Sequence, residues 1–181
     1  MIFSKVIFLF ITSTSAGSVI YQDVTPLTGC LRTITNKCKA FAAATNAWSS
    51  PLDMNGRTNM DTTYIALLKS INDCTPIASS ITPMTDEDYG IFQDVAPETI
   101  NTFISTIDIM KQKKPAYDEA AITTIIADGV TAIQSASRKL MDQILAKIPE
   151  TEQTNAQSHI TALDQAFSLL KIFLRGGGQQ I

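Results

Sequence analysis

The sequence has few charged side chains and no concentration of positive charge. Charged residues make up 17% of the 181 positions and the formal net charge is −3; soluble domains typically carry about 25% charged residues. A protein that binds nucleic acid needs a basic patch, so no nucleic-acid partner is expected. The chain is long enough for one domain with a sizeable hydrophobic core.

Residues that bind metals or perform catalysis are also scarce. His159 is the single histidine, and neither a Cys-x-x-Cys nor a Glu-x-x-His motif is present, so no metal and no cofactor are expected. His159 lies next to Ile160 in a polar stretch and is predicted to be a surface or edge histidine. No nucleophile lies in a pattern that pairs it with a base. We therefore expect a protein that is not an enzyme, and a hydrolase would need a catalytic pairing that the sequence does not display.

No apolar run approaches the roughly 20 residues that a membrane-spanning helix needs. The N-terminus has one early charge at Lys5, an apolar run over residues 6–11 and then small residues. This layout is typical of a secretory signal peptide, here residues 1–17, with a buried N-terminal helix as the alternative. We expect a secreted protein of the extracellular space or cell wall that is not transmembrane. It would have one helical domain over residues 18–175 and a disordered tail over residues 176–181.

Three cysteines in an oxidising compartment leave one without a partner. Cys30 and Cys38 would lie roughly 12 Å apart on one predicted helix, beyond the limit of about 7 Å for a disulfide. Cys74 lies on the next predicted helix and could meet either one. Cys38 lies on the core-facing side and closer to the level of Cys74, so a Cys38–Cys74 disulfide is predicted, with Cys30 free or intermolecular. Three buried thiols remain the alternative.

The sequence also lacks the two-residue alternation of half-buried strands. Apolar side chains instead recur at steps of three and four residues, which is the pattern of amphipathic helices. Helices are expected from Thr25-Pro26 to about Trp48, from Met60 to Ile81, from Thr85 to Lys114, from Asp118 to Ile148, and from Pro149-Glu150 to Leu174.

Turn and proline signals refine this picture. Asn55-Gly56 is the strongest turn signal and separates the first two helices. Pro76 and Pro97 fall inside the second and third helices and predict kinks there. The sequence thus predicts an all-α fold, an up-and-down bundle of four to five long amphipathic helices with proline kinks in the second and third.

Two further features bear on function without deciding it. Gly129 and Ala136 lie in the apolar stripe of the fourth helix, where small side chains allow close packing or leave room for a ligand. Lys111, Lys113 and Lys114 at the end of the third helix could bind an anion or a head group. The alternative is that these lysines complement the negative end of the helix dipole.

The second half of the chain resembles a known family. Lys113-Lys114-Pro-Ala-Tyr-Asp118 precedes the long helix patterned with Ile, Thr and Asp, Ala146-Lys-Ile-Pro149 follows it, and Leu163-Asp-Gln-Ala-Phe167 lies in the closing helix. This order resembles the fungal hydrophobic surface-binding protein A family, also called the cell wall mannoprotein or galactomannoprotein family. The resemblance covers essentially the mature chain and is strongest from Asp94 onward.

The resemblance implies an exported helical domain that binds hydrophobic surfaces or holds an acyl chain, such as that of a fatty acid, between its helices. The alternative is a structural or antigenic cell wall mannoprotein with a closed core, which binds wall polysaccharide or a secreted enzyme. If an acyl chain is held, the residues of the apolar stripes are the candidates to line its cavity: Phe41, Ile71, Phe103, Ile107, Ile126, Val130, Ile133, Leu140, Ile144, Phe167 and Leu170.

Overall fold

Seven helices follow one another along residues 24–176, the part of the chain that the structure, a computed structural model, describes. They are α1 (Thr25–Ala47), α2 (Met54–Ser80), α3 (Asp86–Gln93), α4 (Ala96–Gln112), α5 (Lys114–Glu119), α6 (Thr123–Leu145) and α7 (Glu150–Leu174). No strand occurs within residues 24–176. The predicted signal peptide and all but the first residue of the predicted tail lie outside this range.

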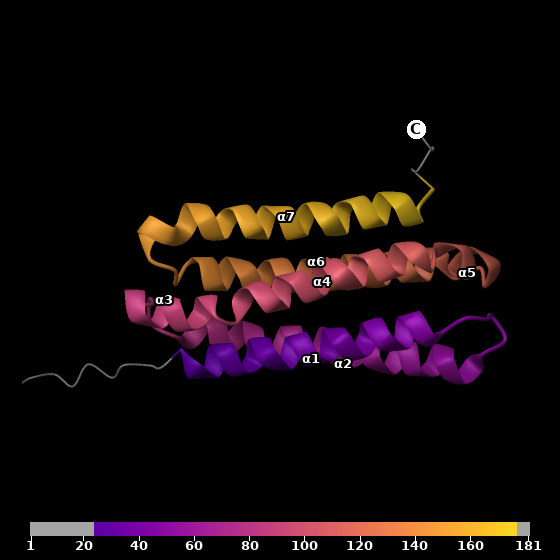
Figure 1. Cartoon of the computed structure of the whole chain (residues 1–181), viewed down its shortest axis with the longest axis horizontal. Coiled ribbons are helices and arrows are strands. Elements are labelled where there is room, and N and C mark those ends of the chain that lie inside the picture. Colours follow the sequence, from indigo (N-terminus) through magenta and orange to yellow (C-terminus); the bar gives the residue numbers. More distant parts are fainter. Residues whose placement is uncertain (1–23, 177–181) are drawn as a thin grey trace, which may run out of the picture.

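The five long helices run up and down and close into a ring. α1 packs against α2 and α4, α6 packs against α2 and α7, and α4 packs against α7. Figure 1 shows α7 on one side of the bundle, α1 and α2 on the other, and α4 and α6 between them, with the short α3 and α5 at opposite ends. This arrangement confirms the predicted all-α up-and-down bundle.

The apolar stripes read from the sequence form the core inside this ring. On α1 the side chains of Leu27, Leu31, Ile34, Cys38 and Phe41 are buried, at the expected steps of three and four. A fully buried side chain of this size contributes about 1.5–3 kcal/mol relative to an exposed one. Long helices that are amphipathic rather than intrinsically stable are held by this shared burial.

Polar pairs inside the core join specific helices. Thr35 of α1 and Thr99 of α4 share a hydrogen bond of 2.9 Å between their hydroxyl oxygens. The Gln134 side-chain amide of α6 donates to Asp164 Oδ1 of α7 at 2.6 Å. Buried polar groups are costly without partners, so these pairs favour one register of the neighbouring helices.

The predicted turn at Asn55-Gly56 is wrong, because these residues form the first turn of α2. The chain turns earlier, between Trp48 and Asp53. Asp53 caps the helix, since its carboxylate accepts a hydrogen bond from the Gly56 amide at 2.8 Å. A Cβ on residue 56 would collide with the Asp53 carboxylate, so this glycine serves a helix start and not a turn.

The helix predicted over residues 118–148 corresponds to α6, which starts later, at Thr123, while residues 118–119 belong to the short α5. Ala121 adopts a left-handed conformation with φ of +55° and ends α5. The Ile122 amide bonds to the Tyr117 carbonyl at 3.0 Å and the Ala121 amide to the Asp118 carbonyl at 3.1 Å. These two bonds are the Schellman pattern of a helix C-terminus, which usually has glycine at the left-handed position. Because alanine stands there instead, the sequence carried no stop signal.

The two prolines differ in their effect. Pro97 lies in the first turn of α4, after a break at Asp94 and Val95, so the predicted third helix is two helices and not one with a kink. Proline is well suited to a first turn because its missing amide proton is not needed there. α2 continues through Pro76 to Ser80, and a kink at that proline stays a prediction.

The predicted Cys38–Cys74 pairing is wrong, because Cys74 is bonded to Cys30. The Cα atoms of Cys30 and Cys74 are 5.6 Å apart. α2 begins at Met54 and not near Met60, which moves Cys74 away from the connecting loop to the level of Cys30. Cys38 is free and faces α4, where its sulfur lies 3.2 Å from Thr106 Oγ1. Burial raises the pKa of the Cys38 thiol to about 11, against the lowering effect of the Thr106 hydrogen bond.

The three lysines around the end of α4 each contact another residue of the protein. Lys111 pairs with Asp108, and Lys114 pairs with Asp118. Lys113 Nζ donates to the Trp48 carbonyl at 3.0 Å, which is at the C-terminal end of α1. These contacts favour the structural interpretation of the lysine cluster over an anion site.

A candidate ligand-binding cavity

An apolar cavity of about 240 Å³ opens inside the bundle, near the end that carries α3. Residues from α1, α2, α3, α4, α6 and α7 line it. The buried part of the wall consists of Leu31, Ile34, Ile71, Tyr89, Phe92, Thr99, Phe103, Ser137, Leu140, Ile144, Ile148 and Leu163. The wall is therefore almost entirely hydrocarbon, as in sites for apolar ligands.

The wall also carries the hydroxyls of Tyr89, Thr99 and Ser137. Ser137 is 4% exposed, and its Oγ has no hydrogen-bond partner within residues 24–176. Many other helical hydroxyls in the chain bond to the carbonyl three or four residues earlier, as Thr106 does with Thr102 and Thr131 with Ala127. A buried hydroxyl without a partner costs about 1–3 kcal/mol, so Ser137 offers a polar contact to a molecule inside the cavity.

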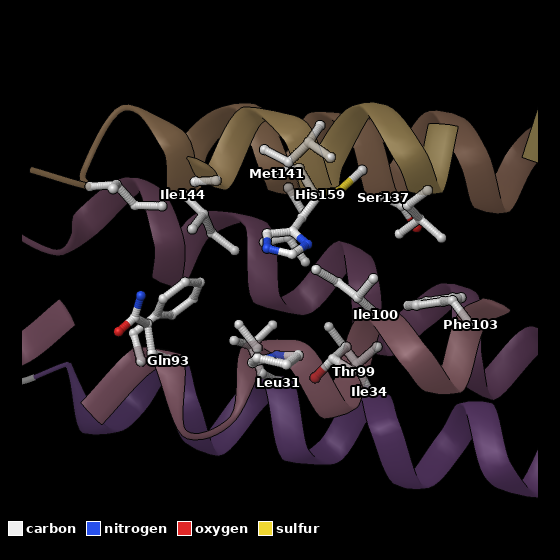
Figure 2. A pocket seen from close by; sticks show the side chains of 18 of the residues that line it. Leu31, Ile34, Gln93, Thr99, Ile100, Phe103, Ser137, Met141, Ile144 and His159 are labelled. Carbon is white, nitrogen blue, oxygen red and sulfur yellow. The ribbon is translucent and has the colours of Figure 1, made fainter. Parts of the chain in front are cut away.

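The mouth of the cavity lies between the start of α4 and the first half of α7. Its rim contains exposed polar side chains, namely Gln93, Asn101, Asn155 and His159. Figure 2 shows the His159 ring projecting into the space between the upper pair of helices and the helices that carry Leu31 and Ile100. Lysine, arginine, aspartate and glutamate are absent from the lining residues. The site thus combines an apolar interior with a rim of polar side chains, of which the His159 imidazole is the ionisable one.

The predicted lining residues divide into two groups. Ile71, Phe103, Leu140 and Ile144 line this cavity. Six of the others, Phe41, Ile107, Val130, Ile133, Phe167 and Leu170, are buried in the core elsewhere, and Ile126 is half-buried against it. Phe167 supports the wall from behind, because its ring meets the Phe103 ring edge-on at 5.8 Å between centroids.

The small residues singled out on the fourth predicted helix do not border the cavity. At Gly129 the neighbouring Tyr64 ring is so close that a Cβ would lie 3.4 Å from it. Ala136 is buried but is not part of the lining. The cavity begins at the next residue, Ser137, and continues to Ile148. Gly129 therefore serves close packing, and the space lies further along the same face.

Sequence reasoning missed much of the rim and of the end wall. Tyr89 and Phe92 come from α3, and the sequence gives no signal that α3 is separate from α4 and contributes to this wall. Ile100, Ala156 and Leu163 also line the cavity and are apolar, so their type made them possible candidates. His159 is predicted to be a surface or edge histidine, and it is exposed at the mouth of the cavity.

Two further features of the described part of the chain concern metal-binding groups and helices that could span a membrane. Within residues 24–176 no group of three or more His, Cys, Asp or Glu side chains is placed to hold a metal ion. In the same part of the chain, every helix is too short or too polar to cross a bilayer.

Comparison with known proteins places this bundle in a family. The family model of hydrophobic surface binding protein A matches residues 24–146, more than half of the chain. The protein belongs to this family. A search of curated proteins by sequence gave no match. The match confirms the resemblance read from the sequence, and it covers five of the six helices that line the cavity.

Solved structures show the same fold. Afmp4p in complex with palmitic acid superposes with a TM-score of 0.79 at 18% identity, covering 84% of this chain and 99% of that one. Ligand binding domain 2 of Penicillium marneffei MP1 protein, complexed with multiple arachidonic acids, gives 0.79 at 11% identity, with 87% and 99% covered. Domain 1 of the same protein, also with arachidonic acids, gives 0.78 at 14% identity, with 84% and 99% covered.

Proposed function

We propose that this member of the hydrophobic surface binding protein A family is a secreted, non-enzymatic protein that holds a fatty acid or similar acyl chain between its helices. The observation that carries the proposal is the apolar cavity walled by six helices and open at a polar rim. The fatty acids named in the similar structures support it. Secretion to the extracellular space or cell wall is supported by the signal-like N-terminus and by the family.

Burial of the chain would supply the binding free energy. Each methylene moved from water into the cavity contributes about 0.8 kcal/mol, so roughly ten methylenes contribute about 8 kcal/mol before the costs of association. The cavity volume of about 240 Å³ is slightly below the range of roughly 300–1,000 Å³ common for small-molecule sites. A long acyl chain therefore leaves its head at the mouth or widens the cavity as it enters.

The site offers little to a chemical reaction. Ser137 has no hydrogen-bonded base, and His159 has no hydrogen bond or ion pair within residues 24–176. Nucleophilic catalysis needs a nucleophile and a base within hydrogen-bond reach. Binding and release is therefore the activity that this geometry supports.

Adsorption to a hydrophobic surface is a second candidate. The last two turns of α7 expose Leu169, Ile172 and Phe173, at steps of three and one on one side of the helix. An exposed apolar patch of this kind suits contact with a nonpolar surface. This face is separate from the cavity, so the two functions can be measured independently.

Native mass spectrometry of the protein, purified as its natural source secretes it, tests the first function. We expect an added mass that matches fatty acid, or uptake of one when the stripped protein is titrated. A clean apo mass with no uptake would contradict the proposal. If such a protein still adsorbed to alkylated silica, surface adsorption through the α7 face would be the function instead.

A further inference from the structure

His159 is the ionisable group best placed to meet the head of a ligand. It lies on the rim, and its ring points into the space above Leu31 and Ile100 (Figure 2). The side chains one turn away on α7 are Asn155, Ala156, Ala162 and Leu163, and none of them is charged. No neighbouring charge on its own helix therefore competes with a ligand for the imidazole.

The other helices add no charged side chain to the cavity lining either. α1, α2, α4 and α6 contribute no titratable side chain to the lining, and α3 contributes only the phenol of Tyr89, which is buried. Imidazole is the side chain whose charge changes between roughly pH 5 and 8. In its charged form, His159 would carry the only full charge among the residues that line the cavity, and it lies at the cavity mouth.

Ser137 in the wall and His159 on the rim mark two places where an anionic head group could lie. A carboxylate offers about four lone-pair sites, and the Ser137 hydroxyl can donate to only one of them. Burying a charge with so few partners is costly. At the rim, water and the imidazole can satisfy the head together, because His159, Asn155 and Asn101 are all exposed.

We infer that His159 receives the anionic head of the bound amphiphile at the cavity mouth, so that the charged form of the imidazole favours anionic ligands over neutral ones. The acyl chain then points inward, past Ser137 and toward Leu31 and Ile71. This inference rests on the proposed function, since it requires that the cavity hold an acyl chain.

Two ligands with the same tail separate the head from the chain. Decyl sulfate keeps its negative charge at all relevant pH values, whereas decanol has none, so any pH response specific to the sulfate comes from the protein. Affinities of the full-length secreted protein would be measured by calorimetry at about pH 5.5 and about pH 8, on either side of the imidazole range. An exposed charge pair is worth up to about 1 kcal/mol, so decyl sulfate should bind roughly two- to fivefold more tightly at the lower pH. Decanol should show no such shift.

Variants assign the response to one residue. In His159→Gln the pH response of decyl sulfate should disappear. Adding Gln157→His to His159→Gln returns an imidazole to the solvent side of α7, because residue 157 is exposed and outside the lining. That double variant should remain flat with pH, which shows that the position of the imidazole matters and not its presence.

The outcomes are distinct. If neither ligand binds, the proposed function fails. If both bind and the response to pH is missing in the natural protein, or persists in His159→Gln, the inference about His159 is wrong while the acyl site stands. If Ser137→Ala, and not His159→Gln, removes the preference for the sulfate over the alcohol, the head lies inside the cavity and the inference is overturned.

Discussion

At the scale of single residues, Ala121 has a strained backbone conformation that ends α5. It is the one non-glycine residue within 24–176 with a positive φ, at +55°. A left-handed conformation costs an L-residue roughly 1–2 kcal/mol. The strain is held by the two capping hydrogen bonds at the end of α5 and by burial of Tyr117 and Ile122 on either side. The turn between α5 and α6 thus has an alanine where glycine would be cheaper.

Replacing this residue by glycine should stabilise the protein. Ala121→Gly removes the strain of roughly 1–2 kcal/mol and adds an entropic cost of about 0.4–1 kcal/mol from the more flexible unfolded chain. We expect a gain of up to about 1.6 kcal/mol in the free energy of unfolding, measured by urea denaturation. The control is Ala120→Gly, at φ of −81°, which should lose about 0.5–1 kcal/mol. Equal losses in both variants would show that Ala121 is unstrained.

At the scale of helices, the Cys30–Cys74 bond fixes α1 against α2. It closes a loop with a sequence separation of 44 residues. In the chain-entropy account, a disulfide over a loop of this length restricts the unfolded chain and stabilises the fold by about 2–4 kcal/mol. The bond joins α1 to α2, the helix whose start the sequence predicts six residues too late. Confirming the Cys30–Cys74 pairing would therefore also support a start of α2 at Met54.

Removing this bond should cost far more than altering the free thiol. The double variant Cys30→Ser, Cys74→Ser should lose about 2–4 kcal/mol in the free energy of unfolding. Cys38→Ser replaces the thiol near Thr106 by a hydroxyl and should lose about 1 kcal/mol. Peptide mapping should find Cys38 as the thiol that reacts only after unfolding, because it is buried. A disulfide-linked Cys38 peptide, or equal losses in the two variants, would contradict the pairing.

The ends of the helices show which features the sequence predicts and which it does not. The stripe of α1 follows from its periodicity, and the starts of α1 and α7 follow from the proline signals at Thr25-Pro26 and Pro149-Glu150. The start of α2 did not, because Asn55-Gly56 reads as a turn unless the Asp53 cap is known. The end of α5 did not either, since Ala121 is not a residue that marks a left-handed position. Errors arose at helix ends, where local capping hydrogen bonds and not the apolar periodicity decide the boundary.

At the scale of the whole molecule, the sequence predicted the bundle but not where its interior is open. Four of the predicted residues, including Phe103 and Leu140, line the cavity, since any core residue near it qualifies. An apolar stripe gives the same signal whether a neighbour fills it or leaves space. The opening depends on how α3 and α7 pack against the other helices at this end of the bundle, which the stripes do not encode. Small residues were a poor guide, as Gly129 is covered by Tyr64.

Filling the cavity tests the central claim most directly. Ala156 lines the cavity on α7 and is half-buried, whereas Ala162 is exposed on the same helix and outside the lining. Ala156→Phe places a ring in the space that the acyl chain would use, and Ala162→Phe places the same ring in solvent. Both variants should keep the helical circular dichroism of the natural protein.

The measurement is the affinity for palmitate, by calorimetry, of the natural protein and of the two variants. Crowding of a packed site costs about 1–3 kcal/mol, so Ala156→Phe should bind about tenfold or more weakly. Ala162→Phe should bind as the natural protein does. Palmitate that binds Ala156→Phe as tightly as the natural protein would show that the acyl chain does not occupy this cavity.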